Sequence, residues 1–225
     1  MYDLKRLALL MDGGFVTKRL REELSRSHPT ADHIEKLAKL VLSDTALAGM
    51  TLFRIFYYDS PPYERTGVHP LTKAKIEFGK KEVAARNAAI LDSLAGRTDF
   101  AVRRGRLSLD GWKLRGSVLN RPAARTELTV KEEDVIPDFK QKEVDLKIGL
   151  DIAWISLKQI ASNICLVTAD SDFVPAMKFA RREGVRIYLQ TMGQSPVKEL
   201  KEHADVVLSY PGFRAAGVKP PVEPL

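Results

Sequence analysis

The chain has 225 residues, of which 44% are apolar, and its formal net charge is +7. This apolar fraction is typical of a globular protein with its own core, and the basic charge favours a polyanionic partner such as nucleic acid. Its one cysteine excludes a disulfide or a thiolate zinc site within one chain, and no apolar run is long enough to span a membrane, so we expect a cytoplasmic protein.

Short apolar segments that end at aspartates indicate the strands of a buried sheet. Residues 7–11 form one such segment, which Asp12 and two glycines end, and residues 163–168 form another, which Asp170 follows. Residues 142–160 fit both a strand and a helix, and their length without a turn favours a helix. The other predicted elements are strands over 51–58, 185–189 and 206–208, and helices over 32–47, 71–95, 172–183 and 197–202, the first of them with a cap at Asp32 and Glu35.

Strands that alternate with helices predict an α/β fold with a mostly parallel sheet, in which ligands bind beyond the carboxyl ends of the strands. Residues 98–119 alternate apolar and polar types around Asp110-Gly111, which predicts a β-hairpin. We therefore expect one domain over 1–210 with a basic insertion at about 97–125. A flexible tail rich in proline and glycine is expected over 211–225.

Aspartates are the residues most suited to chemistry in this sequence. Asp12 and Asp170 each follow a predicted strand, Asp172 lies next to Asp170, and Asp145 begins the helical segment. Carboxylates brought together repel one another, and Mg²⁺ or Mn²⁺ relieves that repulsion because these hard cations prefer oxygen ligands. The histidines, by contrast, are scattered and are expected at the surface: His28, His33, His69 and His203.

These segments resemble a known family. The matching stretches are residues 9–14, residues 142–145 with Asp151 six positions later, and residues 166–175, followed by Gly184-Val185 and His203-Ala204-Asp205. In this order and spacing, over about residues 5–210, the chain resembles the NYN domains, in the branch of LabA-like proteins, within the PIN-like nuclease superfamily. One departure is that many NYN domains carry an asparagine shortly after the first aspartate, where this chain has Gly14 and Phe15.

The resemblance implies a Rossmann-like sheet flanked by helices and the activity of a metal-dependent endoribonuclease that hydrolyses RNA. It makes the metal-holding and catalytic residues Asp12, Asp145, Asp170 and Asp172, with Mg²⁺ or Mn²⁺ as the cofactor. The main alternative is a catalytically weak module that binds nucleic acid or protein. A phosphatase or receiver-like protein lacks support, because Asp12 does not begin the Asp-x-Asp-x-Thr pattern. The sequence leaves a homodimer open.

Each aspartate also has a plain structural interpretation. Asp12 would end a strand in a glycine turn, and Asp172 would cap a helix. Asp145 would be an ordinary acidic residue near the start of a helix, where the helix dipole favours a negative charge. Asp151 lies about 120° around a helix from Asp145, so we expect it to support the site through a hydrogen bond rather than to bind the metal. Asp59 precedes two prolines by two residues and is interpreted as a turn residue.

Cations and aromatic residues are interleaved in the predicted insertion, which suits phosphates and unpaired bases. The predicted nucleic-acid-binding residues are Arg103, Arg104, Arg106, Lys113, Arg115 and Trp112, with Arg97, Arg121 and Arg125 nearby. The alternative is a solvated hairpin face with Trp112 in the core.

Overall fold

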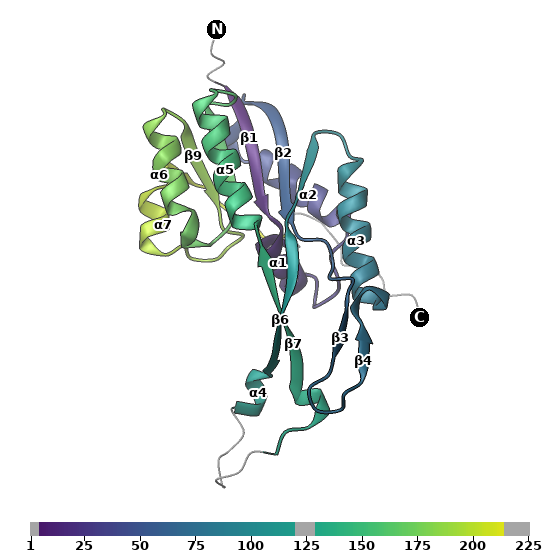
Figure 1. Ribbon diagram of the computed structural model, residues 1–225. Coiled ribbons are helices and arrows are strands. Elements are labelled where there is room, and N and C mark those ends of the chain that lie inside the picture. The colour runs from purple at the N-terminus through teal and green to yellow at the C-terminus, as the bar shows by residue number, and fades with distance from the viewer. Residues whose placement is uncertain (1–4, 120–128, 214–225) are drawn as a thin grey trace.

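The computed structural model describes residues 5–119 and 129–213. A parallel sheet of six strands forms the centre of the molecule (Figure 1), in the order β10-β9-β8-β1-β2-β5. The strands are β1 (Arg6–Asp12), β2 (Thr51–Asp59), β5 (Phe100–Arg104), β8 (Asn163–Val167), β9 (Arg186–Gln190) and β10 (Val206–Val207). The predicted α/β fold with a parallel sheet is therefore confirmed.

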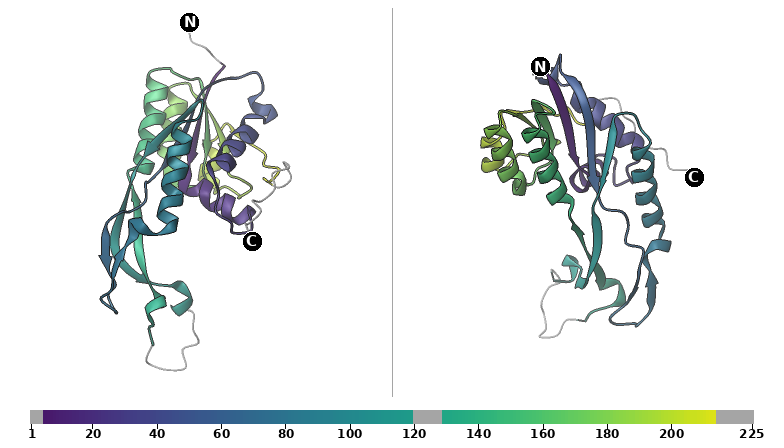
Figure 2. Two further views of the ribbon diagram at one scale, coloured as in Figure 1. Left: turned by 90° about the vertical axis from the view of Figure 1, so that its right-hand side faces the viewer. Right: turned by 45° about the horizontal axis from the view of Figure 1, so that its top comes forward.

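Helices cover both faces of the sheet (Figures 1 and 2). One face carries α1 (Gly13–Glu23), α2 (Ala31–Leu42) and α3 (Glu82–Ala95), and the other carries α5 (Val144–Leu157), α6 (Val174–Arg182) and α7 (Lys198–Glu202). Leu9 and Met11 of β1 join the core on the first face, whereas Ala8 and Leu10 join the core on the second. This double burial explains why the sequence of β1 is continuously apolar rather than alternating.

Two antiparallel ribbons extend the molecule beyond the sheet (Figure 1). The larger pairs β6 (Arg106–Leu114) with β7 (Val135–Lys142), and the smaller pairs β3 (Thr66–Val68) with β4 (Lys75–Glu77). Because β6 follows β5 after one residue, the large ribbon leaves the sheet at the carboxyl ends of its strands. The short elements are α4 (Gly116–Leu119) and 3-10 turns at Thr45–Leu47, Phe78–Lys80, Glu132–Asp134 and Ser171–Phe173.

The predicted hairpin turn is wrong, although a basic ribbon is present. Asp110 and Gly111 lie inside β6, where the register shifts between Leu109 and Trp112 and Gly111 has a φ of 109°. This is a bulge, and a glycine with positive φ suits a bulge as well as a turn. Residues 100–104 also belong to the central sheet, so the ribbon begins at residue 106 and returns over 135–142 rather than spanning 97–125. Arg121 and Arg125 lie outside the described residues.

Other expectations need correction at the level of single elements. The helix expected over 71–95 begins only at residue 82, and α1 was not predicted because two glycines open it. Helix α2 is capped by Thr30 with His33, not by Asp32 with Glu35. His33 and His69 are buried rather than at the surface, and the side chain of Phe213, in the predicted tail, is fully buried against the His33 ring. Residues 214–225 lie outside the described part of the chain.

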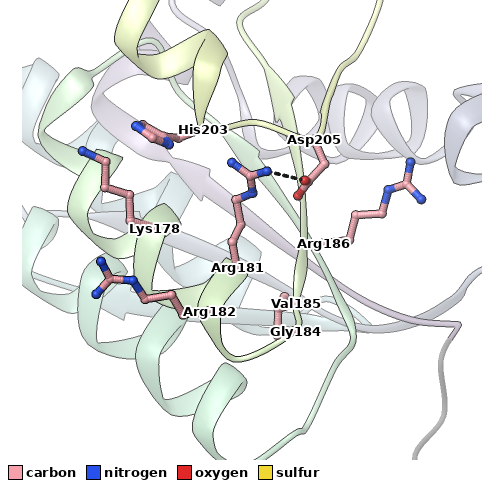
Figure 3. A pocket seen from close by; sticks show the side chains of 8 residues that line it. All are labelled: Lys178, Arg181, Arg182, Gly184, Val185, Arg186, His203 and Asp205. Atoms are coloured by element: carbon pink, nitrogen blue, oxygen red, sulfur yellow. Dashed lines mark ion pairs between the residues drawn. The ribbon is translucent and has the colours of Figure 1, made fainter.

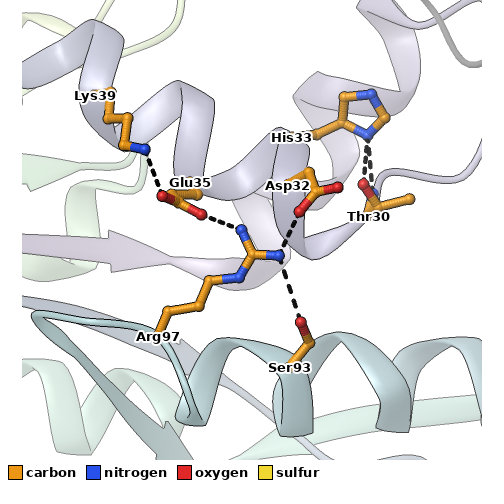
Figure 4. A network of polar contacts seen from close by, with 7 residues as sticks. All are labelled: Thr30, Asp32, His33, Glu35, Lys39, Ser93 and Arg97. Carbon is orange, nitrogen blue, oxygen red and sulfur yellow. Dashed lines mark hydrogen bonds and ion pairs between the residues drawn. The ribbon is translucent and has the colours of Figure 1, made fainter.

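A polar network joins α2 to the end of α3 (Figure 4). The guanidinium of Arg97 forms ion pairs with Asp32 and Glu35 and a hydrogen bond with Ser93. The hydrogen bond from Arg97 holds the pKa of Asp32 below its usual value. Arg97, which the sequence placed beside the basic insertion, therefore stabilises the fold on the α2–α3 face. Within the described residues, no helix is both long and apolar enough to cross a membrane.

Candidate active site at the carboxyl edge of the sheet

The fold brings three of the predicted aspartates to the same edge of the sheet. Asp12 is the last residue of β1, Asp170 lies just beyond the neighbouring strand β8, and Asp145 lies in the first turn of α5. Their carboxyl groups are close enough to repel one another, since the charges of Asp145 and Asp170 add to the rise that burial causes in the pKa of Asp12. The edge of the sheet, not their spacing in the chain, makes them neighbours.

Asp12 is the most firmly held of these carboxylates. Its Oδ1 accepts a hydrogen bond of 3.2 Å from the amide of Phe15, which makes Asp12 the N-cap of α1, and its Oδ2 accepts one of 3.2 Å from the Thr168 hydroxyl. Burial raises the pKa of Asp12 to about 6, against the effect of these two bonds, and repulsion from Asp145 and Asp170 adds to the rise. The site thus holds a carboxylate whose negative charge is poorly compensated by the protein.

Thr168 links Asp12 to Asp170, and no pattern in the sequence had singled it out. Its buried hydroxyl donates to Asp12 and accepts a hydrogen bond of 3.2 Å from the amide of Asp170. Asp170 then caps the next turn, because its Oδ1 accepts a hydrogen bond of 2.9 Å from the amide of Asp172. The cap predicted at Asp172 is therefore formed by Asp170, and Asp172 leaves its own carboxylate exposed.

Asp145 interacts electrostatically with both Asp170 and Asp172. Partial burial raises its pKa, and repulsion from Asp170 and Asp172 raises it further. Asp145 follows Glu143, whose φ of 74° turns the chain sharply from β7 into α5. All four predicted acids are consequently coupled at one edge, Asp12 through Asp145 and Asp170, and Asp172 through Asp145.

Asp151 lies on the same helix as Asp145 but is engaged elsewhere. Its Oδ2 accepts hydrogen bonds of 2.9 Å from Arg103 Nε and from the hydroxyl of Tyr58. More than one full turn separates it from Asp145 along α5. The helical geometry led us to expect that Asp151 would form a hydrogen bond, and its partners are a basic residue and a tyrosine.

Asp59, interpreted from sequence as a turn residue, lies at the end of β2 beside β1. Its Oδ1 accepts hydrogen bonds from the Ser60 amide at 2.7 Å and from Gln141 Nε2 at 2.6 Å, and burial raises its pKa. Gln141 belongs to β7, so this bond fixes the base of the large ribbon to the edge of the sheet. The strand end before Asp59 was a usable signal for its position, whereas nothing in the sequence distinguished Gln141.

Gly13 allows α1 to start against β2. A Cβ at residue 13 would lie 2.5 Å from the carbonyl oxygen of Tyr58 and 2.8 Å from the Cβ of Asp59. Such close approaches do not occur without a shift of the backbone, so only glycine fits between the end of β1 and the end of β2. The glycine after Asp12 is thus a packing requirement of the site.

The donor set suits a hard divalent cation, although the ligands are not gathered into a complete shell. The four carboxylates offer only oxygen atoms, which are the ligands of Mg²⁺ and Mn²⁺. Burial raises the pKa of Asp12 and of Asp145, and repulsion from the neighbouring carboxylates adds to the rise. Among residues 5–119 and 129–213, no group of three or more His, Cys, Asp or Glu is arranged to hold a metal ion. Mg²⁺ usually takes only one or two carboxylates and completes its shell with water and substrate phosphate, so the residues present fit it.

The cations of the large ribbon and its base already have partners. Arg103 pairs with Asp151 at 2.9 Å, and Arg115 Nε donates to the carbonyl of Glu133 at 2.7 Å. The other predicted cations also face carboxylates: Arg104 faces Asp92 at 2.7 Å, Arg106 faces Glu143 at 3.3 Å, and Lys113 faces Asp138 at 2.6 Å. Most of the positive charge that the sequence assigned to RNA is thus balanced within the protein.

Trp112 packs among the aromatic residues that join the two ribbons. Its ring meets His69 edge-on at 5.0 Å between centroids and lies 6.3 Å from Phe78. Phe78 in turn packs on Phe139 of β7 at 5.1 Å between centroids. The half-buried Trp112 is therefore placed as in the alternative interpretation, in a small core.

A hollow along α1 begins beside the acids. It has a volume of about 570 Å³, starts at Gly14, and is bordered by Thr17, Lys18, Arg21 and Arg26. Within the described residues, Lys18, Arg21 and Arg26 form no ion pair. Glu22, which also borders the hollow, pairs with Arg19 instead. These cations were not singled out from the sequence, because α1 itself was not predicted.

Comparison with protein families agrees with this geometry. A model of the NYN domain family matches residues 88–211, more than half of the chain, and the chain therefore belongs to this family of nuclease-like domains in the PIN-like superfamily. The match includes Asp145, Asp170 and Asp172, whereas Asp12 and Asp59 lie before its first residue. No curated protein matches the chain.

Proposed function

We propose that the protein is a metal-dependent endoribonuclease whose active site is the group of carboxylates at the carboxyl edge of the sheet. The observation that carries this proposal is the placement of Asp12, Asp145 and Asp170, which come from three different segments to one edge of the sheet. Burial there raises the pKa of Asp12 and of Asp145, and the neighbouring carboxylates add to the rise. Unbalanced carboxylates destabilise a fold, so their presence together at the carboxyl edge of the sheet, where α/β proteins bind ligands, supports a role in binding a cation.

Asp12, Asp145 and Asp170 would hold Mg²⁺ or Mn²⁺, with Asp172 at the rim. When bound, such an ion lowers the pKa of a water molecule and neutralises charge on a phosphate. The chain itself contributes orientation. The Phe15 amide and the Thr168 hydroxyl fix both oxygens of Asp12, and the Asp172 amide fixes one oxygen of Asp170. Asp151 would act through Arg103 and Tyr58 rather than on the ion.

The RNA backbone would lie along the α1 hollow. Lys18 and Arg21 border it without acidic partners, and its first residue, Gly14, directly follows the residues of the site. When exposed cations bind phosphates, they displace the counterions condensed on the nucleic acid. This release is a large source of affinity for a nucleic acid. The ribbon cations and Trp112 remain predicted RNA-binding residues of secondary importance, since their side chains are already engaged.

The test is to incubate the purified protein with labelled single-stranded RNA, structured RNA and DNA, in Mn²⁺, Mg²⁺ or chelator. We expect internal cleavage of RNA with either ion and none with chelator. Cleavage that continues in chelator would overturn the metal dependence, and binding without cleavage in every ion would favour the second candidate.

That second candidate is a catalytically weak module that binds nucleic acid. It is favoured by the absence, within the described residues, of a preformed group of three metal ligands. The finer expectations from the sequence also remain proposals: membership in the LabA-like branch, which rests on the order and spacing of the matching segments, a cytoplasmic location and a homodimer.

A further inference from the structure

A second basic hollow lies at the opposite edge of the sheet from the aspartates. It has a volume of about 750 Å³ and surrounds Gly184 and Val185, which lead into the first residue of β9. Because the sheet is parallel, the amino end of β9 is at the edge opposite the carboxyl ends that carry Asp12 and Asp170. The hollow is therefore separate from the proposed active site.

Four cations from α6 and β9 surround this hollow. Figure 3 shows Lys178 and Arg182 on one side, Arg186 on the other, and Arg181 between them. The only acid among the lining residues that the structure describes is Asp205, which pairs with Arg181 at 3.1 Å. With four cations and one acid, the lining thus carries a net charge of +3 when its histidine is neutral.

Asp205 does not neutralise the remaining cations. Its second oxygen accepts a hydrogen bond of 2.8 Å from the amide of Ile187, so Arg181 and Asp205 form a fixed wall. Lys178 has only a long ion pair of 3.8 Å with Glu199. In the described part of the chain, Arg182 and Arg186 form no ion pair, and the Arg186 guanidinium lies 5.6 Å from the centre of the Tyr188 ring.

A purely structural role accounts for only part of this arrangement. Arg181 and Arg182 lie in the last turn of α6, where cations favour the helix dipole. Lys178 lies one turn earlier, and Arg186 belongs to β9, so neither gains from that position. The last carbonyls of α6 already accept hydrogen bonds from Gly184 and Val185, which reduces the negative potential that an anion would meet there.

We propose that this hollow is a second binding site, specific for phosphate groups. Guanidinium groups bind phosphate oxygens through paired N–H donors. The three cations that Asp205 does not pair, Lys178, Arg182 and Arg186, suit a ligand with several phosphates. Two sources share this chemistry: the backbone of an RNA strand away from the cleavage site, and a free polyphosphate. The proposal does not depend on nuclease activity.

The experiment measures binding in the presence of EDTA, so that cleavage does not enter. Inorganic tripolyphosphate is titrated by calorimetry and fluorescent oligouridylate by anisotropy, against the wild type and Arg182→Ala/Arg186→Ala. We expect the variant to bind at least one probe about fivefold more weakly, the size expected from the removal of two exposed charges. The matched control is Lys36→Ala/Lys158→Ala, which removes the same charge from exposed lysines that do not line the hollow.

The two probes separate the sources of phosphate. Weaker binding of tripolyphosphate alone identifies a free polyphosphate site, and weaker binding of the oligonucleotide identifies an RNA site. Affinities that are unchanged for both probes, or that fall equally in the control, overturn the proposal. If the alanine variant melts at a lower temperature than the wild type, the titrations are repeated with Arg182→Gln/Arg186→Gln. This variant removes the charges but keeps part of the aliphatic side chains.

Discussion

The carboxyl edge of the sheet and the large ribbon are both densely charged, but they differ in whether neighbouring charges balance one another. At the edge, Asp12, Asp145 and Asp170 repel one another, and this repulsion adds to the raised pKa values of Asp12 and Asp145. On the ribbon, Lys113 and Arg106 each face an acid. The difference teaches that the density of charge in a sequence is a weaker guide to function than the charge that folding leaves unbalanced.

Asp145 and Asp151 offer the sharpest test of this contrast, since they lie on one helix with opposite surroundings. Asp145→Asn should reduce kcat/KM for RNA cleavage by more than about 100-fold, whereas Asp151→Asn should cost about 10-fold and respond to excess Mn²⁺. Stability should change in the reverse order. Asp145→Asn removes repulsion and should raise the melting temperature, whereas Asp151→Asn breaks the ion pair with Arg103 and should lower it.

Each of these two variants serves as the control for the other, because both replace a carboxylate of α5 by an amide. Cleavage assays and thermal melts on the same preparations give the comparison. An equal fall of activity in the two variants would show that the unbalanced carboxylate has no special role.

Asp12 should make the protein less stable as the pH rises. Its pKa is about 6 in the folded protein against a usual 3.8, so the folded state holds the proton more tightly than the unfolded state. The stabilisation is complete below pH 3.8 and is lost as the pH rises through about 6, at a cost of up to about 3 kcal/mol. Denaturant titrations in EDTA between pH 4 and pH 7.5 cover nearly all of this window and measure the fall.

Asp12→Asn is the matched variant, because asparagine also caps helices while remaining neutral. We expect its stability to fall less over the same pH range, since Asp12 then no longer contributes to the fall, whereas Asp59 and Asp145, whose pKa values are also raised, still do. Added Mg²⁺ should stabilise the wild type at pH 7.5 and leave the variant nearly unchanged. Parallel pH profiles for the two proteins would contradict the unbalanced charge at Asp12.

The smallest expected effect concerns RNA affinity and compares α1 with the ribbon. Lys18→Ala/Arg21→Ala should flatten the dependence of log affinity on log salt by about 0.7 for each cation that no longer binds a phosphate of a single strand. Arg103→Ala/Arg104→Ala/Arg106→Ala should change the slope less, because these cations are paired within the protein. Anisotropy titrations in EDTA provide both slopes, and a larger change in the ribbon variant would restore the ribbon as the main RNA-binding surface.

Much of the sheet could be predicted from the sequence because its strands are buried on both faces and therefore continuously apolar. The edge position of Asp12 and Asp170 followed from the same pattern. Helix α1 could not be predicted, because its start depends on Gly13 fitting against Tyr58 of a strand some 45 residues away along the chain, an approach without a local signal. The Asp110-Gly111 pair wrongly predicted a turn, because a glycine with a positive φ occurs in both turns and β-bulges.

Partners of charged residues were likewise beyond local analysis. The ion pair of Arg103 with Asp151 joins positions 48 residues apart, and the bond of Gln141 to Asp59 joins positions 82 apart. A sequence shows how many charges a segment carries, but the tertiary fold decides which of them remain available to a ligand.

Gly13 gives the site an unusual intolerance to mutation. The residue carries no chemistry, yet any side chain there would push the first turn of α1 away from the end of β2 and take the amide of Phe15 with it. The carboxylate of Asp12 would then lose the donor that aims it. In a saturation library, position 13 should thus be as restricted as the acids themselves, and a sequence search that scores only charged positions would overlook the residue that sets their geometry.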